Sequence, residues 1–287
     1  NEYDRYNFTF RNTSYFLKDK LRLDASASYI YQKDQNMTNQ GVYSNPLVPA
    51  YLFPRGDDFD NVRLYQRWDE SRNLYTQAWD YGSGDMSFQN PYWIMNKMIN
   101  QTKKRRYMLS ANLKYDVTDW LDVTGRVKVD NADMDITEKR YAGTDTNFAG
   151  EKGMYSIIKR NDRQIYADAI ANIDLTFAGD YHLSANVGAS LKDVRMDFMG
   201  WGGDLRKIPN FFSITNISTT NYKEREDGSH IQSQSIFANV ELAWKSMLYL
   251  TVTGRNDWES ALAFSKYKSF FYPSVGLSAV VSEMVDM

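Results

Sequence analysis

The stretch YLTVTGRNDW, Tyr249 to Trp258, indicates the fold because apolar and polar residues alternate along most of it. Successive side chains of an extended strand point to opposite faces. Leu250 and Val252 therefore share one face with Gly254. The opposite face carries Thr251, Thr253, Arg255 and Asp257. A strand of this kind separates an apolar environment from a watery one, and the rest of the chain indicates which environments these are.

The same alternating unit recurs along the chain, each time after a short polar turn. These turns lie near Asp19, Asp119, Gly179 and Ser246. An alternating run stands on both sides of each turn, which predicts antiparallel hairpins. A slip of one residue would move every charge to the apolar face, so the register is well specified. The pattern predicts nine strands, at about 5–17, 21–32, 105–116, 120–134, 162–177, 181–195, 231–245, 248–258 and 269–282.

The connections between the predicted strands alternate between short turns and long segments. The long segments are 33–104, 135–161 and 196–230, with a shorter one at 259–268. The predicted strands are 11 to 16 residues long, whereas strands of globular proteins usually have about five or six residues and a bilayer needs about nine to eleven. Aromatic residues also gather at both strand ends, as in membrane barrels.

We therefore predict an all-β fold in which residues 1–287 form part of one antiparallel transmembrane β-barrel domain. Nine long up-and-down strands would be joined by short periplasmic turns and long extracellular loops, and 33–104 would be a long extracellular loop region. The apolar face would contact outer-membrane lipid and the polar face would line a watery lumen. A soluble β protein with the apolar face inside is the alternative.

Composition excludes several classes of function. The net charge is −2 and the 34 basic residues are scattered, so no nucleic-acid interface is expected. The chain has no cysteine and two histidines, which excludes thiolate metal sites, cysteine nucleophiles and multi-histidine metal sites. No catalytic constellation appears, so we expect neither a cofactor nor an enzyme activity.

The first long segment contains the richest candidate binding residues. Aromatic faces beside acids and amides suit sugar rings or peptide side chains, which need stacking and directional hydrogen bonds. The candidates for contact with a substrate or a lid protein are Trp68, Trp79, Tyr81, Tyr92 and Trp93, with Trp201 in a later loop. Packing of the loop on itself is the alternative for each ring.

Two further groups of residues are notable. Arg255 and Asp257 lie two residues apart on the polar face, where we expect them to face the lumen and to be close enough to pair. The acidic stretch 57–61 has oxygen ligands suited to calcium, but it lacks the EF-hand pattern and is expected to be a solvated turn.

Specific motifs resemble one known family. LYLTVTGRNDWESAL followed by KSFFYPSVGLSAVVSEM resembles the barrel of SusC/RagA-like TonB-dependent outer-membrane transporters. The likeness is sharpest at Thr253–Trp258 and Phe271–Val275, and NPYW at Asn90–Trp93 is also similar. The resemblance implies a barrel of about 22 strands with a separate plug domain. On this basis we expect the chain to be an internal barrel fragment of a longer protein.

The resemblance also implies an activity, namely uptake of a nutrient such as an oligosaccharide or a peptide across the bacterial outer membrane. Uptake would be driven by the TonB complex, acting through parts not in this chain, together with a SusD-like surface lipoprotein. The alternatives are a passive porin or channel and a surface-adhesion barrel.

Overall fold

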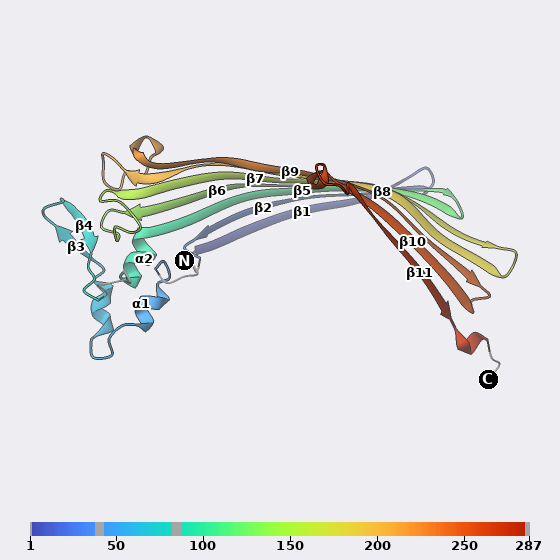
Figure 1. Cartoon of the computed structure of the whole chain (residues 1–287), viewed down its shortest axis with the longest axis horizontal. Coiled ribbons are helices and arrows are strands. Elements are labelled where there is room, and N and C mark those ends of the chain that lie inside the picture. The colour runs from blue at the N-terminus through green and yellow to red at the C-terminus, as the bar shows by residue number, and fades with distance from the viewer. Residues whose placement is uncertain (1, 38–42, 82–87, 285–287) are drawn as a thin grey trace.

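The computed structural model describes residues 2–37, 43–81 and 88–284, and its main feature is one curved antiparallel sheet (Figure 1). Nine strands follow one another in the sheet in chain order. They are β1 (Glu2–Phe16), β2 (Leu21–Gln35), β5 (Met98–Thr118), β6 (Leu121–Tyr141), β7 (Gly153–Phe177), β8 (Tyr181–Leu205), β9 (Ile217–Trp244), β10 (Leu248–Glu259) and β11 (Ser269–Ala279). The nine predicted long up-and-down strands are confirmed.

Short turns join the strands at one end of the sheet, which we call the turn end. They lie at 17–20, 119–120, 178–180 and 245–247, where the sequence predicts them. The third turn has positive φ at Ala178 (50°) and Gly179 (76°). Glycine adopts this left-handed conformation without steric cost, which favours a tight hairpin at this point.

At the opposite end, which we call the loop end, the strands are longer than the sequence predicts. β7 begins at Gly153, β8 ends at Leu205 and β9 begins at Ile217. The predicted long loops 135–161 and 196–230 are therefore wrong in extent, and the connections shrink to 142–152 and 206–216. The first connection likewise shrinks from 33–104 to 36–97. The added residues carry polar side chains on both faces, so the alternation disappears although the backbone pairing continues.

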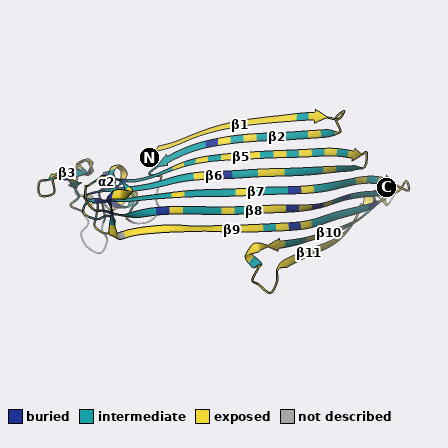
Figure 2. Cartoon of the chain, turned by 90° about the horizontal axis from the view of Figure 1, so that it is seen from above, coloured by how far each residue is buried: buried dark blue, intermediate teal, exposed yellow. Residues whose placement is uncertain are grey.

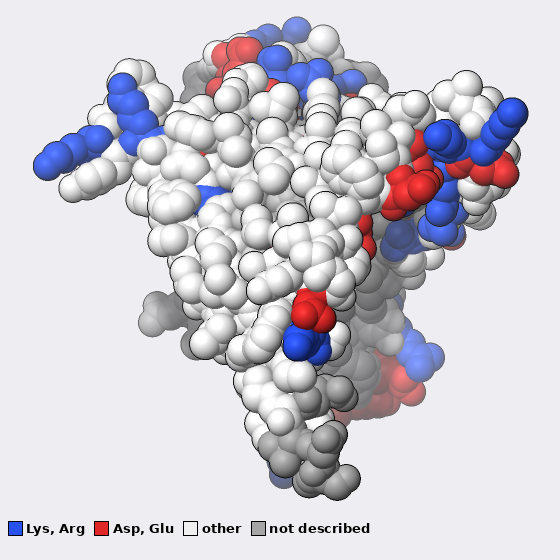
Figure 3. All heavy atoms as spheres, turned by 90° about the vertical axis from the view of Figure 1, so that its right-hand side faces the viewer, with Lys and Arg blue, Asp and Glu red and all other residues white. Residues whose placement is uncertain are grey.

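The two faces of the sheet differ in chemistry along the half nearer the turn end. One face carries large apolar side chains that are 42–56% exposed: Leu109, Leu113, Val127, Val187, Leu191, Ile236, Leu250 and Val252. Exposed apolar area of this extent indicates a surface that contacts something other than water. Figure 3 views the turn end and shows a broad area without charged side chains. The opposite face carries ion pairs and amides.

The first connection folds into small elements beside the loop end of the sheet (Figure 1). They are α1 (Leu47–Tyr51), the 3-10 helix η1 (Phe59–Arg63), the hairpin of β3 (Gln66–Asp69) and β4 (Leu74–Gln77), and α2 (Pro91–Lys97). Short 3-10 turns follow at Ile214–Asn216 (η2), Ser260–Leu262 (η3) and Val281–Glu283 (η4). Within the described ranges, no helix is long and apolar enough to cross a membrane.

Candidate functional site

The first connection is fixed at Asn90, the residue that caps the start of α2. The Asn90 Oδ1 accepts a hydrogen bond from the backbone N–H of Tyr92 at 2.8 Å. The Nδ2 of the same side chain donates to the carbonyl of Val62 at 2.9 Å and to that of Ala78 at 3.1 Å. Asparagine is a favoured N-cap and Pro91 suits the first helical position. One fully buried side chain thus joins three segments of the connection.

Trp93 is the centre of the small core under this connection. It has no exposed surface, and it clusters with Ile94 and Met98. The indole Nε1 donates to Thr144 Oγ1 at 3.0 Å, which ties the first connection to the next loop. This burial corrects the expectation of direct ligand contact for Trp93, because its ring supports the loop from inside.

The other aromatic candidates of the first connection lie in two places. Trp79 and Tyr81 contact each other, with ring centroids 5.2 Å apart, and Tyr81 also contacts Phe53 at 4.8 Å. Trp68 lies on the β3–β4 hairpin, 50% exposed, with its ring 5.2 Å from that of Tyr75. Tyr92 is half-buried on α2. The candidates thus form two small groups, with Trp68 exposed on the hairpin and Trp79 and Tyr81 half-buried.

The phenol of Tyr81 has a shifted pKa, and the indole N–H of Trp79 lacks a hydrogen-bond partner among the described residues. Partial removal from water, and then a hydrogen bond with the Asp57 carboxylate, raise the pKa of Tyr81. The indole N–H of Trp79 is buried without an acceptor in the described part of the chain. A buried donor of this kind is costly unless something accepts its hydrogen bond.

Trp201 does not lie in the loop predicted from the sequence. It lies within β8, where it pairs with Ile157 of β7 and Glu224 of β9, and it is half-buried. Strand alternation places its ring on the face opposite to that of Gly200 and Gly202. Among the described residues, no ring contact joins Trp201 to the aromatic groups of the first connection.

Gly200 and Gly202 form the floor of a hollow of about 400 Å³ on the polar face, which we call the loop-end cavity. A Cβ at Gly202 would lie 2.8 Å from Ser156 Oγ, so the close approach of β7 and β8 requires glycine. Phe148 from the loop 142–152 also lines the cavity. Its charged lining residues are Glu138, Asp204, Lys223 and Arg225.

The acidic residues around the loop-end cavity have bonding partners, whereas the basic residues form no salt bridges with described residues. Glu138 pairs with Arg140, and Asp204 Oδ1 accepts from the backbone N–H of Gly150 at 2.8 Å. Lys223 and Arg225 of β9, by contrast, form no salt bridge with any described residue. The cavity therefore presents two available cations. The sequence reading missed them because they lie in the charged run KERED, 223–227, inside a segment assigned to a loop.

Nearer the turn end, the polar face carries ordered ion pairs. Arg255 Nε donates to Asp257 Oδ1 at 2.7 Å, as their spacing on one face led us to expect, and Arg255 Nη2 donates to Ser235 Oγ at 2.9 Å. Arg126 binds Asp168 in a bidentate manner, with distances of 2.9 and 2.7 Å. On this part of the polar face, the charges of Arg126 and Arg255 are thus neutralised by acidic partners.

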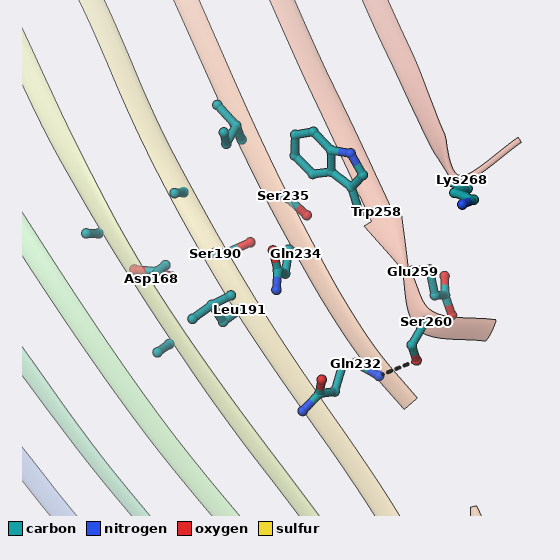
Figure 4. A pocket seen from close by; sticks show the side chains of 14 residues that line it. Asp168, Ser190, Leu191, Gln232, Gln234, Ser235, Trp258, Glu259, Ser260 and Lys268 are labelled. Carbon is teal, nitrogen blue, oxygen red and sulfur yellow. Dashed lines mark hydrogen bonds between the residues drawn. The ribbon is translucent and has the colours of Figure 1, made fainter. Parts of the chain in front are cut away.

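The other face has a hollow of about 820 Å³ where β10 ends (Figure 4). Ala167, Ala169 and Ala189 leave space beside Leu191 and Trp258. At its edge the backbone N–H of Gln232 donates to Ser260 Oγ at 2.8 Å, the dashed line in Figure 4. This side-chain bond stands where the pairing of β9 with β10 stops.

The acidic stretch 57–61 forms a capped turn. Asp58 Oδ1 accepts from the backbone N–H of Asp60 at 2.9 Å, and Arg63 Nε lies 3.2 Å from the Asp60 carboxylate. Across the described residues, no group of three or more His, Cys, Asp or Glu side chains is arranged to hold a metal ion.

Comparison with solved structures identifies the fold. The RagAB peptide importer in its open-open state matches with a TM-score of 0.72 at 14% identity, over 96% of this chain and 29% of that chain. A second structure, of the RagAB peptide transporter, gives a TM-score of 0.71 at 14% identity, over 96% and 30% of the two chains. The siderophore receptor PiuA from Acinetobacter baumannii gives 0.50 at 14% identity, over 96% and 39%.

These matches show that the nine-stranded sheet has the fold of a wall segment of a TonB-dependent transporter barrel. The chain spans about 29–39% of the length of the structures it matches. No protein-family model and no curated protein matches this sequence.

Proposed function

We propose that this chain is part of the barrel wall of a TonB-dependent importer of the SusC/RagA type in the bacterial outer membrane. The observation that carries the proposal is the sheet itself. Its exposed apolar face and its ion-paired polar face are those of a barrel wall between lipid and a watery lumen. The likeness of the fold to the RagAB barrel supports the same assignment.

The wall would contribute lumen polarity and loop contacts rather than chemistry. Trp68, Trp79, Tyr81 and Tyr92 would contact the substrate, an oligosaccharide or a peptide, or a SusD-like lipoprotein covering the loop end. Arg255 and Asp257 would face the lumen. Because binding energy alone cannot drive uphill import, the proposal requires the TonB complex, acting through parts of the transporter outside this chain.

Uptake by cells that express the complete transporter tests the proposal. Fluorescent peptides and oligosaccharides of defined length are added to cells with and without a functional TonB complex. We expect accumulation of one of these classes, and its loss when TonB is removed. Accumulation that persists without TonB would indicate a passive porin instead. Binding to the cell surface with no uptake in either strain would indicate an adhesion barrel.

A further inference from the structure

β9 has an open edge inside the sheet. It runs from Ile217 to Trp244, but β10 pairs only with residues 233–244. On that side, the described residues provide no strand for 217–232. β9 is not an outer strand of the sheet, because β10 lies beside it. The edge is open because β10 ends at Glu259 and the chain reverses through 260–268 into β11. In Figure 2 the β10–β11 hairpin ends well before β9 does.

The direction of the free backbone groups follows from one hydrogen bond. In an antiparallel sheet, the N–H and C=O of alternate residues point to opposite sides of the strand. The N–H of Gln232 points to the β10 side, since it donates to Ser260. Even-numbered residues towards the start of β9 therefore direct their backbone groups to the open side.

Two of these edge N–H groups are bonded by side chains. Gly228 N donates to Asp227 Oδ1 at 2.7 Å, and Thr220 N lies 3.4 Å from Ser218 Oγ. The N–H groups of Tyr222, Glu224 and Glu226 make no such bond within the described part of the chain. Residues 222–232 are all exposed, and Figure 2 shows β9 as exposed over this length. The edge is thus open to an incoming strand.

Charge makes this edge selective. Lys223 and Arg225 point to the loop-end cavity, whereas alternation places Glu224 and Glu226 on the opposite face. Charged side chains normally protect an edge from indiscriminate pairing. A strand with opposite charges at facing positions is instead favoured, because cross-strand pairs of opposite charge stabilise a sheet.

We propose that the open edge of β9, around Tyr222–Glu226, binds an extended peptide as an added strand. The favoured peptide carries acidic side chains at alternate positions, facing Lys223 and Arg225. This inference rests on the proposed importer function and names its substrate class as peptide. An oligosaccharide lacks the regularly spaced N–H and C=O groups that strand addition uses.

Binding to the purified full-length transporter tests this inference with a fluorescent seven-residue peptide of alternating Asp and Thr. Two derivatives carry N-methyl groups on the Asp residues only or on the Thr residues only, so that each blocks one edge of the peptide. A peptide that adds to β9 uses one edge. We expect one derivative to bind at least tenfold more weakly than the other, and equal binding of the two would overturn the inference.

Variants of β9 provide the matching test on the protein side. Glu224→Pro removes an N–H that points to the open edge, and edge strands tolerate proline. Glu224→Ala removes the same side chain but keeps that N–H. We expect Glu224→Pro to bind the peptide at least tenfold more weakly than Glu224→Ala does. Equal affinities of two folded variants would contradict strand addition.

The cations are tested with Lys223→Ala and Arg225→Ala together, against the conservative Lys223→Arg. We expect the double variant to lose at least tenfold in affinity for the Asp peptide, and Lys223→Arg to retain most of it. The results also separate the two proposals. Peptide uptake that depends on TonB but not on this edge would remove only the strand-addition inference. TonB-independent entry would remove the importer function itself.

Discussion

At the scale of single residues, two side chains are distinguished by their burial. The sequence pattern does not separate either of them from its neighbours. Trp93 looks like the other aromatic residues of its segment, yet it is the only tryptophan among the described residues with no exposed surface. Asp168 looks like the other acids of the polar face, yet its side chain is fully buried against Arg126. Each residue leads to a prediction.

Replacing Trp93 with alanine should open the first connection. Loss of a buried tryptophan costs about 3–5 kcal/mol, and the hydrogen bond to Thr144 is lost as well. We expect proteolysis within 36–97 to accelerate strongly while the barrel stays folded. Trp68→Ala is the control, since Trp68 is 50% exposed and should change the cleavage rate little. Similar rates for the two variants would refute the role of Trp93 as an anchor.

Replacing Arg126 with methionine should destabilise the wall, because it leaves the buried Asp168 carboxylate unpaired. The expected loss is about 1–3 kcal/mol, below the range for fully buried pairs because the Arg126 side chain is 40% exposed. The measurement is the midpoint of denaturant unfolding of the full-length protein. The double variant Arg126→Met, Asp168→Leu should recover much of the loss. If it is no more stable than the single variant, the unpaired carboxylate is not the cause.

At the scale of elements, the alternation of apolar and polar residues covers only part of each long strand, whereas backbone pairing covers the whole strand. Along β7, β8 and β9, the alternation of apolar and polar residues ends well before the backbone pairing does. The alternating part has an apolar face that needs an apolar medium. The extended part, by contrast, meets water on both faces, so that the strand functions there as a support for loops and as an edge.

A charge introduced into β10 should separate the two faces. Val252→Arg puts a cation on the apolar face near the middle of β10, where lipid exposure would cost about 2–4 kcal/mol at the centre of the bilayer. Thr251→Arg puts the same cation on the polar face and should cost little. The readout is the amount of folded full-length protein in the outer membrane, from heat-dependent gel mobility. Equal loss for both variants would argue against a lipid-facing side.

At the scale of the whole molecule, the sheet has two distinct ends. All short turns lie at one end, and the folded first connection, the loop-end cavity and the open edge of β9 lie at the other (Figure 1). An importer of the proposed kind exposes the loop end to the cell exterior and the turn end to the periplasm.

Single cysteines test this orientation, since the chain has none of its own. Glu70→Cys places a thiol on the β3–β4 hairpin at the loop end, and Lys18→Cys places one in a short turn; both positions are exposed. A membrane-impermeant maleimide should label Glu70→Cys in intact cells. Lys18→Cys should react only after the outer membrane is permeabilised. The reverse pattern would mean that the barrel has the opposite orientation.

What the sequence alone determined is the repetitive part of the molecule. The nine strands, their order, the four short turns and the pairing of Arg255 with Asp257 follow from a period-two pattern. This is possible because successive side chains of a strand point to opposite faces. A strand between an apolar and a watery environment therefore has apolar and polar residues in alternation. The same pattern led to a transmembrane barrel, and the motifs at Thr253–Trp258 and Phe271–Val275 added the resemblance to a transporter family. Comparison with solved structures confirms the barrel fold.

The extent of the strands, the burial of particular aromatic side chains and the position of the open edge all depend on contacts in the folded molecule. Strands with water on both faces carry no alternation, so the sequence predicts this strand only from 231, although β9 begins at Ile217. The burial of Trp93 depends on Thr144, 51 residues away. The open edge exists because two neighbouring strands differ in length. Each of these features is a relation between distant segments, which no local pattern of residues records.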